Sequence, residues 1–378
     1  MKILVTGGAG FIGSHTADGL LRAGHLVRIL DNLSEPVHLP DVQPYIPENT
    51  EFVKGDVTSR QDMRAALSGI DAVYHFAAYQ DYLLDFSTFF HVNAVGTALL
   101  YEIIVADNLP VQKIVLASSQ AVYGEGRYCC AVHGVTYPPM RDISDLEKGQ
   151  WGIRCGRCGN AMIPEATDES VVNPQTQYAM AKYTEEMIGL NLGRRWGIPT
   201  VALRYSIVQG PRQSFHNAYS GACRVFCLSY HFGKTPVIYE DGQQFRDFVN
   251  IEDVVRANLV ALDHPKADFQ VFNVGGGKPY SVSEFAEIVA RAAKSESPAR
   301  VTGEFRFGDT RHIISNLSRI ETIGWKPLYS PEKSVTDYLQ WLTSQSALED
   351  ALAAADRTMR TAGVVRPAKA ALVSPAVQ

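Results

Sequence analysis

Short apolar runs alternate with longer stretches of mixed apolar and polar residues through the first 205 residues of the chain. Six of the apolar runs are too short for helices, so they predict buried strands at 2–6, 26–30, 51–54, 72–76, 113–117 and 200–204. The stretches between them predict helices at 14–23, 61–69, 89–107 and 175–195. This β-α-β alternation predicts an α/β fold, a doubly wound parallel sheet with helices on both faces.

The alternation loosens beyond residue 209. Short strand-like runs lie there among helical patterns, with runs at 237–239, 271–274 and 300–302 and helices at 251–262 and 282–293. We therefore predict a nucleotide-binding domain at 1–205 and a smaller α+β lobe at 206–343 that closes over a substrate. Residues 344–378 are rich in alanine, valine and proline, and we expect a tail that begins as a helix and ends in a dozen disordered residues.

Composition narrows the class of protein. Apolar residues make up 46% and charged residues 20% of the chain, as in ordinary globular proteins. The formal net charge of −5 and the lack of a long basic run argue against a nucleic-acid-binding surface. No apolar stretch approaches the roughly 18 residues that a membrane span needs, and the chain opens on a predicted strand rather than a signal peptide. We therefore expect a cytoplasmic protein that contacts neither membrane nor nucleic acid.

Glycines crowd the turn between the first predicted strand and the first predicted helix. Gly7, Gly10 and Gly13 recur at intervals of three, and Gly8, Gly10 and Gly13 fit the pattern G-x-G-x-x-G. Such glycines permit a tight turn, a close approach of a pyrophosphate to the backbone and close packing of helix on strand. The amides that open the helix would then face the phosphates of a dinucleotide, as in a Rossmann fold.

Acidic and small residues follow the next strands, where the rest of a dinucleotide would lie. Asp31 ends the second strand, where a carboxylate accepts from a ribose 2′-hydroxyl and repels a 2′-phosphate, so we predict NAD rather than NADP. Asp56 follows the third strand and is placed either to meet an adenine edge or to cap a helix. Ala77 and Ala78 follow the fourth strand, where their small side chains leave room for the cofactor.

Tyr178 and Lys182 share one face of the helix predicted at 175–195. An ammonium group beside a phenol stabilises the phenolate, so the tyrosine can act as a base well below its free pKa of about 10. Ser119 follows the fifth strand and is placed to hydrogen-bond the same reacting hydroxyl. Together the three side chains can deprotonate an alcohol while a nicotinamide accepts its hydride.

These motifs resemble those of the extended short-chain dehydrogenases/reductases. Within that family they most resemble the motifs of the NAD-dependent sugar-nucleotide epimerases and dehydratases. In the first domain the resemblance rests on residues 6–13, Asp31-Asn32-Leu33, His75-Phe76-Ala77-Ala78, Ser118-Ser119, Val122-Tyr123-Gly124 and Tyr178 with Lys182. In the second it rests on Leu203-Arg204-Tyr205, Gly210-Pro211-Arg212-Gln213, Asp241-Gly242, Arg246-Asp247-Phe248 and Arg306-Phe307-Gly308-Asp309.

The resemblance implies roles for further residues. NAD would be held by Gly7, Gly10, Phe11, Ile12, Gly13, Asp31, Asn32, Asp56, Val57, Ala77, Ala78, Asn93, Tyr178 and Lys182. A nucleotide-sugar substrate would be held by Gln80, Ser119, Gln120, Asn217, Arg246, Arg306 and Asp309. The two arginines would grip the diphosphate, with structural salt bridges as their alternative. A homodimer is also implied, through helices at 89–107 and 175–195 whose apolar faces could instead be core.

Two residues beside Ser119 separate epimerisation from dehydration. Related 4,6-dehydratases carry an Asp-Glu pair there as acid and base, whereas Gln120-Ala121 can supply neither. We therefore predict a nucleotide-sugar 4-epimerase that oxidises C4 to a 4-keto sugar and returns the hydride without stereospecificity.

Three segments refine the expected substrate. Gln80-Asp81-Tyr82, residues 206–210 and a cysteine-bearing insertion resemble the dTDP-L-rhamnose 4-epimerases, which form dTDP-6-deoxy-L-talose. A UDP-hexose 4-epimerase, a non-catalytic NAD sensor and a net oxidoreductase are the alternatives. The intact base argues against a sensor, and the paired arginines argue against a net oxidoreductase.

The insertion at 125–166 stands where this family needs only a short loop. It carries Cys130-Ala-Val-His133-Gly134 and Cys155-Gly-Arg-Cys158-Gly159, two knuckles that predict a zinc ribbon with Cys130, His133, Cys155 and Cys158 as ligands. Cys129 could replace Cys130, and iron could replace zinc. Four protein ligands leave no position for a substrate, so the predicted metal is structural. The remaining pair, Cys223 and Cys227, we expect to be packing residues.

Overall fold

The computed structural model describes residues 1–378 except 36, 40–41, 82–83, 218–220, 346–349 and 369–378. Tyr82 of the motif after the fourth strand therefore lies outside the described residues. So do nearly all of the dozen terminal residues for which we expected disorder.

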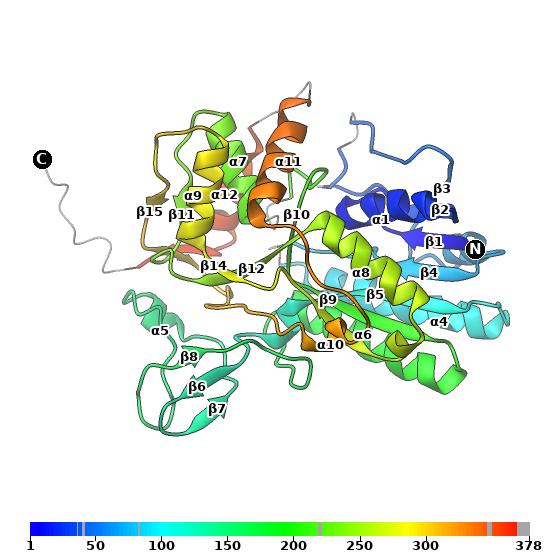
Figure 1. Ribbon diagram of the computed structural model, residues 1–378, viewed down its shortest axis with the longest axis horizontal. Helices are drawn as coiled ribbons and strands as arrows, with labels where there is room; N and C mark the ends of the chain where they lie inside the picture. The colour runs from blue at the N-terminus through cyan, green and yellow to red at the C-terminus, as the bar shows by residue number, and fades with distance from the viewer. Residues whose placement is uncertain (36, 40–41, 82–83, 218–220, 346–349, 369–378) are drawn as a thin grey trace, which may run out of the picture.

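Seven parallel strands form one sheet in the order β13-β9-β5-β4-β1-β2-β3 (Figure 1). They are β1 (Lys2–Thr6), β2 (Leu26–Asp31), β3 (Thr50–Lys54), β4 (Ala72–His75), β5 (Lys113–Ser119), β9 (Thr200–Tyr205) and β13 (Val271–Val274). The predicted doubly wound parallel sheet is confirmed. Its strand order reverses between β1 and β4, and ligands of such sheets bind beyond the carboxyl ends of the strands at this point.

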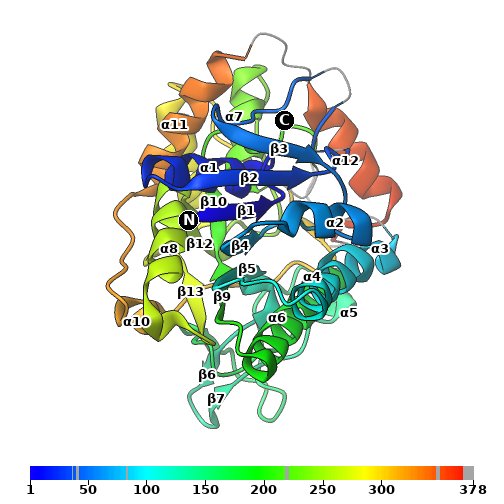
Figure 2. The same ribbon diagram turned by 90° about the vertical axis from the view of Figure 1, so that its right-hand side faces the viewer.

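Helices cover both faces of the sheet, which is why its central strands read as continuous apolar runs. One face carries α1 (Phe11–Arg22) and α8 (Ile251–Asp263), and the other carries α2 (Arg60–Leu67), α4 (Gly96–Ala106) and α6 (Gln177–Trp196) (Figure 2). α6 begins at Thr176, whose side chain accepts from the Ala179 N–H, and ends at Gly197 in the left-handed region. These caps fix the helix that carries Tyr178 and Lys182.

One continuous helical segment corrects our expectation about apolar stretches. It joins α3 (Phe86–Phe90), a π-helical turn η1 (His91–Val95) and α4, and by length and composition it could cross a membrane. Its most apolar window is 56% buried inside the protein, where the segment packs against α2 and α6. It is therefore a core helix of the α/β layer.

The chain returns to the main sheet after entering the smaller lobe. We expected residues 251–262 and 271–274 in that lobe, but α8 packs beside α1, and β13 pairs with β9 at the sheet edge. A short apolar run does not show which sheet it will join. We had assigned 271–274 to the smaller lobe because it follows other elements of that lobe in the sequence, and this assignment was wrong.

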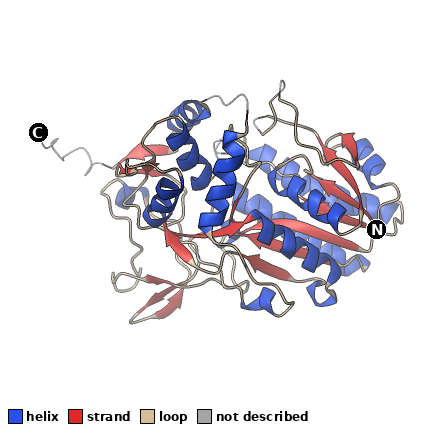
Figure 3. Cartoon of the chain, turned by 45° about the horizontal axis from the view of Figure 1, so that its top comes forward, coloured by secondary structure: helices blue, strands red, loops and turns tan. Residues whose placement is uncertain are grey.

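The smaller lobe is mixed α and β, as predicted, and helices predominate in it (Figure 3). Its strands are β10 (Ile207–Gln209), β12 (Phe245–Asn250) and β14 (Pro279–Ser281) in one sheet, β11 (Val237–Ile238) with β15 (Arg300–Val301), and β16 (Glu304–Arg306) with β17 (Val365–Pro367). Its helices are α7 (Ala222–His231), α9 (Val282–Ala292), α11 (Pro331–Thr343) and α12 (Ala351–Thr361). Two short turns, η3 (Pro265–Ala267) and α10 (Ser318–Glu321), pack on the core of the main sheet instead. The predicted helix at the start of the tail is confirmed as α12.

The insertion forms a small antiparallel sheet that projects from the body of the molecule (Figure 1). Its strands run in the order β7-β6-β8, namely β6 (Tyr128–Cys130), β7 (Gly134–Thr136) and β8 (Ile163–Pro164). A 3-10 turn, η2 (Gln120–Tyr123), links it to β5, and α5 (Ile143–Leu146) lies within it. The insertion thus begins one short turn after Ser119 in the sequence.

Candidate active site

A cavity of about 540 Å³ opens beyond the carboxyl ends of the central strands and continues into the smaller lobe. Every residue that we predicted to bind NAD or substrate lines it, with the exception of Asn93. The two sets meet at Ser119, Tyr178 and Lys182. The fold therefore brings together at one cavity residues that are far apart in the sequence.

The glycine loop between β1 and α1 leaves room only for backbone. Gly7 has a φ of +67°, and a Cβ added to Gly13 would lie 2.1 Å from the Gly7 carbonyl oxygen. Among the described residues no side chain caps the first turn of α1, so its amides are available to an anion at the cavity wall. This cradle fits the pyrophosphate of NAD.

Asp31 supports the glycine loop as well as lining the cavity. Its carboxylate accepts from the Ala9 N–H at 3.0 Å and from the Leu33 N–H at 2.9 Å. Its position at the cavity fits the predicted contact with a ribose hydroxyl.

Asp56 also lines the cavity, where its carboxylate accepts from Asn32 Nδ2 at 2.8 Å and from the Thr58 N–H at 2.8 Å. Although burial opposes it, these hydrogen bonds hold the pKa of Asp56 below its usual value. The alternative role of helix cap belongs to Ser59 instead, whose side chain caps α2.

Asn93 is a correction to the predicted cofactor set. It is fully buried and does not line the cavity. Its amide oxygen accepts from the Tyr79 N–H at 2.8 Å, and its amide nitrogen donates to the Tyr79 carbonyl at 3.1 Å. Asn93 therefore orders the loop that carries Ala77, Ala78 and Gln80, one layer behind the cavity.

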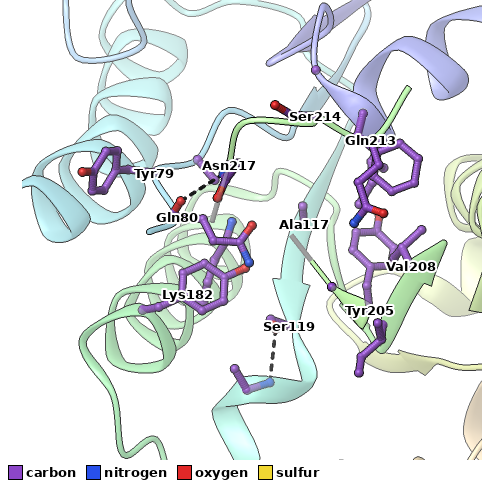
Figure 4. Close-up of a pocket in the computed structure, with 18 of the residues that line it drawn as sticks. Tyr79, Gln80, Ala117, Ser119, Lys182, Tyr205, Val208, Gln213, Ser214 and Asn217 are labelled. Atoms are coloured by element: carbon purple, nitrogen blue, oxygen red, sulfur yellow. Dashed lines mark hydrogen bonds between the residues drawn. The ribbon is translucent and has the colours of Figure 1, made fainter. Parts of the chain in front are cut away.

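Ser119 and Lys182 reach the cavity from β5 and α6 (Figure 4). The Ser119 hydroxyl accepts from the Ala121 N–H at 3.1 Å and hydrogen-bonds the Tyr178 phenol. Burial raises the pKa of Tyr178, the bond to Ser119 partly offsets this, and the charge of Glu185 raises it further. We expected the pKa of Tyr178 to be lowered, but the protein groups around it raise the pKa instead.

Burial is the main cause, and the carboxylate that faces Lys182 adds to it. The Lys182 side chain is 3% exposed, and its ammonium donates to Glu185 Oε2 at 2.8 Å. We predicted the effect of the lysine charge without this carboxylate. Glu185 was missed because no motif in the sequence marks it.

Gln80, Gln120 and Asn217 also line the cavity. Asn217 Nδ2 donates to the Gln80 carbonyl at 3.3 Å, which joins the smaller lobe to the loop after β4 (Figure 4). Gln120 is 7% exposed, and its amide oxygen has no hydrogen-bond partner in the described part of the chain. A buried amide that lines a cavity in this state is suited to bind a polar ligand.

The two arginines of the smaller lobe line the cavity but are engaged by the protein. Arg246 donates from Nη1 and Nη2 to the carbonyls of Phe245, Thr310 and Arg311 at 2.9–3.0 Å. Arg306 pairs with Asp309 at 2.6 Å and lies over the Tyr239 ring. Arg246 thus ties the loop around residue 310 to β12, and Asp309 is the ionic partner of Arg306.

Two further amides at the cavity were not predicted. Gln213 is 9% and Gln244 is 5% exposed, and among the described residues neither amide oxygen has a hydrogen-bond partner. Both stand in loops of the smaller lobe, where no local pattern predicts burial. Gln213 belongs to a motif that carries the family resemblance, but no role was predicted for it, and no motif marks Gln244.

The insertion brings its four predicted ligands together. Cys130 Sγ lies 3.7 Å from His133 Nδ1 and 3.6 Å from Cys158 Sγ, and Cys155 Sγ lies 3.4 Å from His133 Nδ1. Tetrahedral zinc, with Zn–S bonds of about 2.3 Å and Zn–N bonds of about 2.0 Å, separates its ligand atoms by about 3.5–3.8 Å. The donor set therefore fits zinc, and Cys129 is not part of it.

Backbone amides act on the sulfur of Cys130. The N–H groups of Val132 and His133 lower the pKa of the Cys130 thiol to about 6. Gly134 and Gly159 follow the two knuckles with positive φ values of +70° and +74°. By contrast, Cys223 and Cys227 are buried in the core of the smaller lobe, as expected of packing residues.

Comparisons with known proteins agree with this arrangement. The model of the NAD dependent epimerase/dehydratase family matches residues 3–141 and 155–275. The chain is 34% identical over 355 residues to a dTDP-L-rhamnose 4-epimerase of Burkholderia thailandensis, which covers 91% of this chain and 95% of that protein.

Solved structures of sugar-nucleotide epimerases share the fold. The UDP-glucose 4-epimerase of Thermotoga maritima with UDP-glucose superposes with a TM-score of 0.75 at 26% identity, over 91% of this chain and 99% of that one. The UDP-glucose 4-epimerase of Thermus thermophilus in complex with NAD gives a TM-score of 0.70 at 25% identity, with the same coverage.

Proposed function

The chain belongs to the NAD-dependent epimerase/dehydratase family, and we propose that its substrate is dTDP-L-rhamnose, which it inverts at C4 to dTDP-6-deoxy-L-talose. It is an NAD-dependent nucleotide-sugar epimerase and hence an isomerase. The observation that supports the finer assignment is the similarity to the Burkholderia thailandensis enzyme along nearly the whole of both chains.

The residues at the cavity suit transient oxidation of a carbinol. Bound NAD supplies the chemistry of accepting the C4 hydride and giving it back. Tyr178 takes the proton of the C4 hydroxyl as the C4–H and O–H bonds break and a carbonyl forms. Ser119 hydrogen-bonds the same oxygen, and the proton returns from Tyr178 when both bonds re-form, so no net redox occurs.

Gln120 and Ala121 support epimerisation over dehydration. An elimination needs an acid and a base beside Ser119, and an amide and a methyl group provide neither. The keto sugar is therefore left to rotate and be reduced on its other face.

The test is incubation of the purified enzyme with dTDP-L-rhamnose and, separately, with UDP-glucose, without added reductant, followed by NMR. Appearance of the C4-inverted sugar from dTDP-L-rhamnose supports the proposal. Turnover of UDP-glucose alone keeps the epimerase and rejects the deoxysugar. The variant Tyr178→Phe serves as control, and we expect it to lose activity by about 10²–10⁴-fold.

We further propose that the insertion binds one structural zinc ion through Cys130, His133, Cys155 and Cys158. Support comes from the donor set and its spacing, which suit a closed tetrahedral site. Such an ion would hold β6 and the 155–158 knuckle together.

Metal content of the purified protein tests this proposal. We expect one zinc per chain and loss of the metal in Cys155→Ser. Cys129→Ser is the matched control, because Cys129 adjoins a ligand but its sulfur lies outside the cluster, and it should keep the metal. Equal metal content in the two variants would reject the assigned ligands.

We also propose a homodimer that packs α4 and α6 against their counterparts. Exposed apolar side chains on η1 and α6 support it, with Val95 48%, Met180 41% and Met187 41% exposed. Sedimentation of the wild type against Met180→Glu tests it, and we expect the variant to shift towards monomer.

A further inference from the structure

Lys182 and Glu185 form a buried ion pair on α6 at the end of the cavity. Nζ lies 2.8 Å from Glu185 Oε2, and the two side chains are 3% and 1% exposed. The other oxygen of Glu185 is buried and has no hydrogen-bond partner among the described residues. Buried carboxylates normally have both oxygens satisfied, so this one is bound to the rest of the protein chiefly through Lys182.

The other titratable groups described near the pair are tyrosines, a neutral histidine and a second carboxylate, so the cation that faces Glu185 is Lys182. Three tyrosines lie near the charge of Glu185, namely Tyr101 of α4, Tyr205 of β9 and Tyr178 of α6. Burial is the main cause that raises the pKa of each, and the charge of Glu185 raises it further. His75 of β4 faces Lys182, and burial lowers its pKa to about 3, so it stays neutral.

The neighbouring carboxylate, Glu186, is already compensated. It pairs with Arg204 and accepts from the Ser118 hydroxyl. It does not pair with Lys182, but its negative charge contributes to the raised pKa of Glu185, after burial. Among the described residues, Lys182 and Glu185 are the ion pair beside Tyr178.

This pair has two opposite effects on the site. Glu185 accepts from Nζ and so fixes the ammonium in place. The same carboxylate cancels part of the field with which the ammonium favours the Tyr178 phenolate.

We propose that Glu185 is a positioning residue of the epimerase: it holds the Lys182 ammonium at the buried end of the site and balances its charge beside Tyr178. The proposal rests on the proposed roles of Tyr178 and Lys182 as the base and its electrostatic partner. It adds a residue that acts through Lys182 rather than on the substrate.

Burial raises the pKa of Glu185 to about 7, so its charge changes within the working range of an enzyme. Below that pH the carboxyl is neutral and the full lysine charge acts on the phenol. Above it the pair is balanced and the phenol is less acidic. The wild-type pH profile should therefore contain the ionisation of Glu185 as well as that of Tyr178.

The test compares Glu185→Gln with Glu185→Asp in NAD-loaded enzyme. Glutamine keeps an acceptor for Nζ and resembles the neutral carboxyl, so we expect the ionisation near pH 7 to disappear from the kcat/KM profile, while the profile below that pH keeps its wild-type form. Aspartate can still ionise but is one methylene shorter, so this ionisation should remain while kcat falls and KM changes little.

Glu102→Gln is the matched control, because Glu102 is an exposed carboxylate on α4 that pairs with Arg60. It should leave rate and profile unchanged. If the glutamine and aspartate variants share the wild-type profile and rate, Glu185 is only a structural partner and the proposal fails. Undiminished activity of Tyr178→Phe would instead reject the proposed base, whatever Glu185 does.

Discussion

Replacing Arg141 by methionine should loosen the connection between the insertion and the substrate lobe. Arg141 belongs to the insertion, yet its side chain is only 6% exposed and its guanidinium lies against the smaller lobe. It donates to both carboxylate oxygens of Glu240 at 3.0 and 2.8 Å, and to the Asp309 carbonyl at 2.7 Å. It also pairs with Glu125 at 3.3 Å.

The magnitude follows from what would remain after the substitution. Glu125 and Glu240 are 1% and 3% exposed. After the substitution the Arg311 guanidinium would still pair with Glu240, but Glu125 would keep only the hydrogen bond from the Arg311 backbone N–H. Removing one partner of such a buried network costs about 3–5 kcal/mol of unfolding free energy. Because Asp309 holds Arg306 at the cavity, we also expect KM for the nucleotide sugar to rise about tenfold, which corresponds to about 1.4 kcal/mol.

Urea unfolding monitored by tryptophan fluorescence measures the first effect, since Trp151 of the insertion lies 6.1 Å from the Phe305 ring. The double variant Arg141→Met/Glu240→Met should lose less than the sum of the two single variants, because it removes both ends of the pair. Lys148→Met, which breaks an exposed pair with Asp145, is the control and should cost less than about 1 kcal/mol. An Arg141→Met protein as stable as this control, with unchanged KM, would refute the reasoning.

Two other variants test the glycine cradle and a buried histidine. Gly13→Ala places a Cβ 2.1 Å from the Gly7 oxygen, so we expect a loss of about 1–3 kcal/mol in stability and little NAD in the purified protein. Gly152→Ala has open space and should match the wild type in both measurements. The pKa of His75 is lowered by burial from 6.5 to about 3, so as pH falls below 6.5 the unfolded chain binds a proton that the folded chain rejects, and stability falls. His75→Asn should therefore reduce the slope of unfolding free energy against pH, between about pH 6.5 and 5, by up to about 1.4 kcal/mol per unit; an unchanged slope would mean that His75 is not buried as a neutral ring.

Local patterns predicted the first domain well because its strands are buried on both faces. Apolar runs, glycine turns and strand ends then coincide, and the residues at those ends meet at one edge of the sheet. The same logic placed Ser119, Tyr178 and the glycine loop at one cavity. The Cys/His cluster was also predictable, since its ligands lie in two short knuckles.

Other features depend on interactions that no local pattern reports. Asn93 hydrogen-bonds the Tyr79 backbone and does not line the cavity, and Arg246, which does line it, also donates to the carbonyl of Arg311. Glu185 changes the electrostatics of the base, although it differs in no visible way from other helical glutamates. In each case the outcome depends on which group faces a side chain in three dimensions.

The position of β13 at the edge of the sheet has a consequence for synthesis of the protein. All six residues of β9 are buried, and β13 covers the side of β9 that faces away from β5. A nascent chain that ends near residue 205 thus presents an apolar strand with an unpaired edge, which is prone to associate with other chains. The sheet is completed only after residue 274 has emerged from the ribosome, by which time β10, α7 and β12 have already been made. Expression of residues 1–205 alone should accordingly give insoluble protein. The nucleotide-binding domain needs β13, which the chain reaches only after passing through the smaller lobe, to remain soluble.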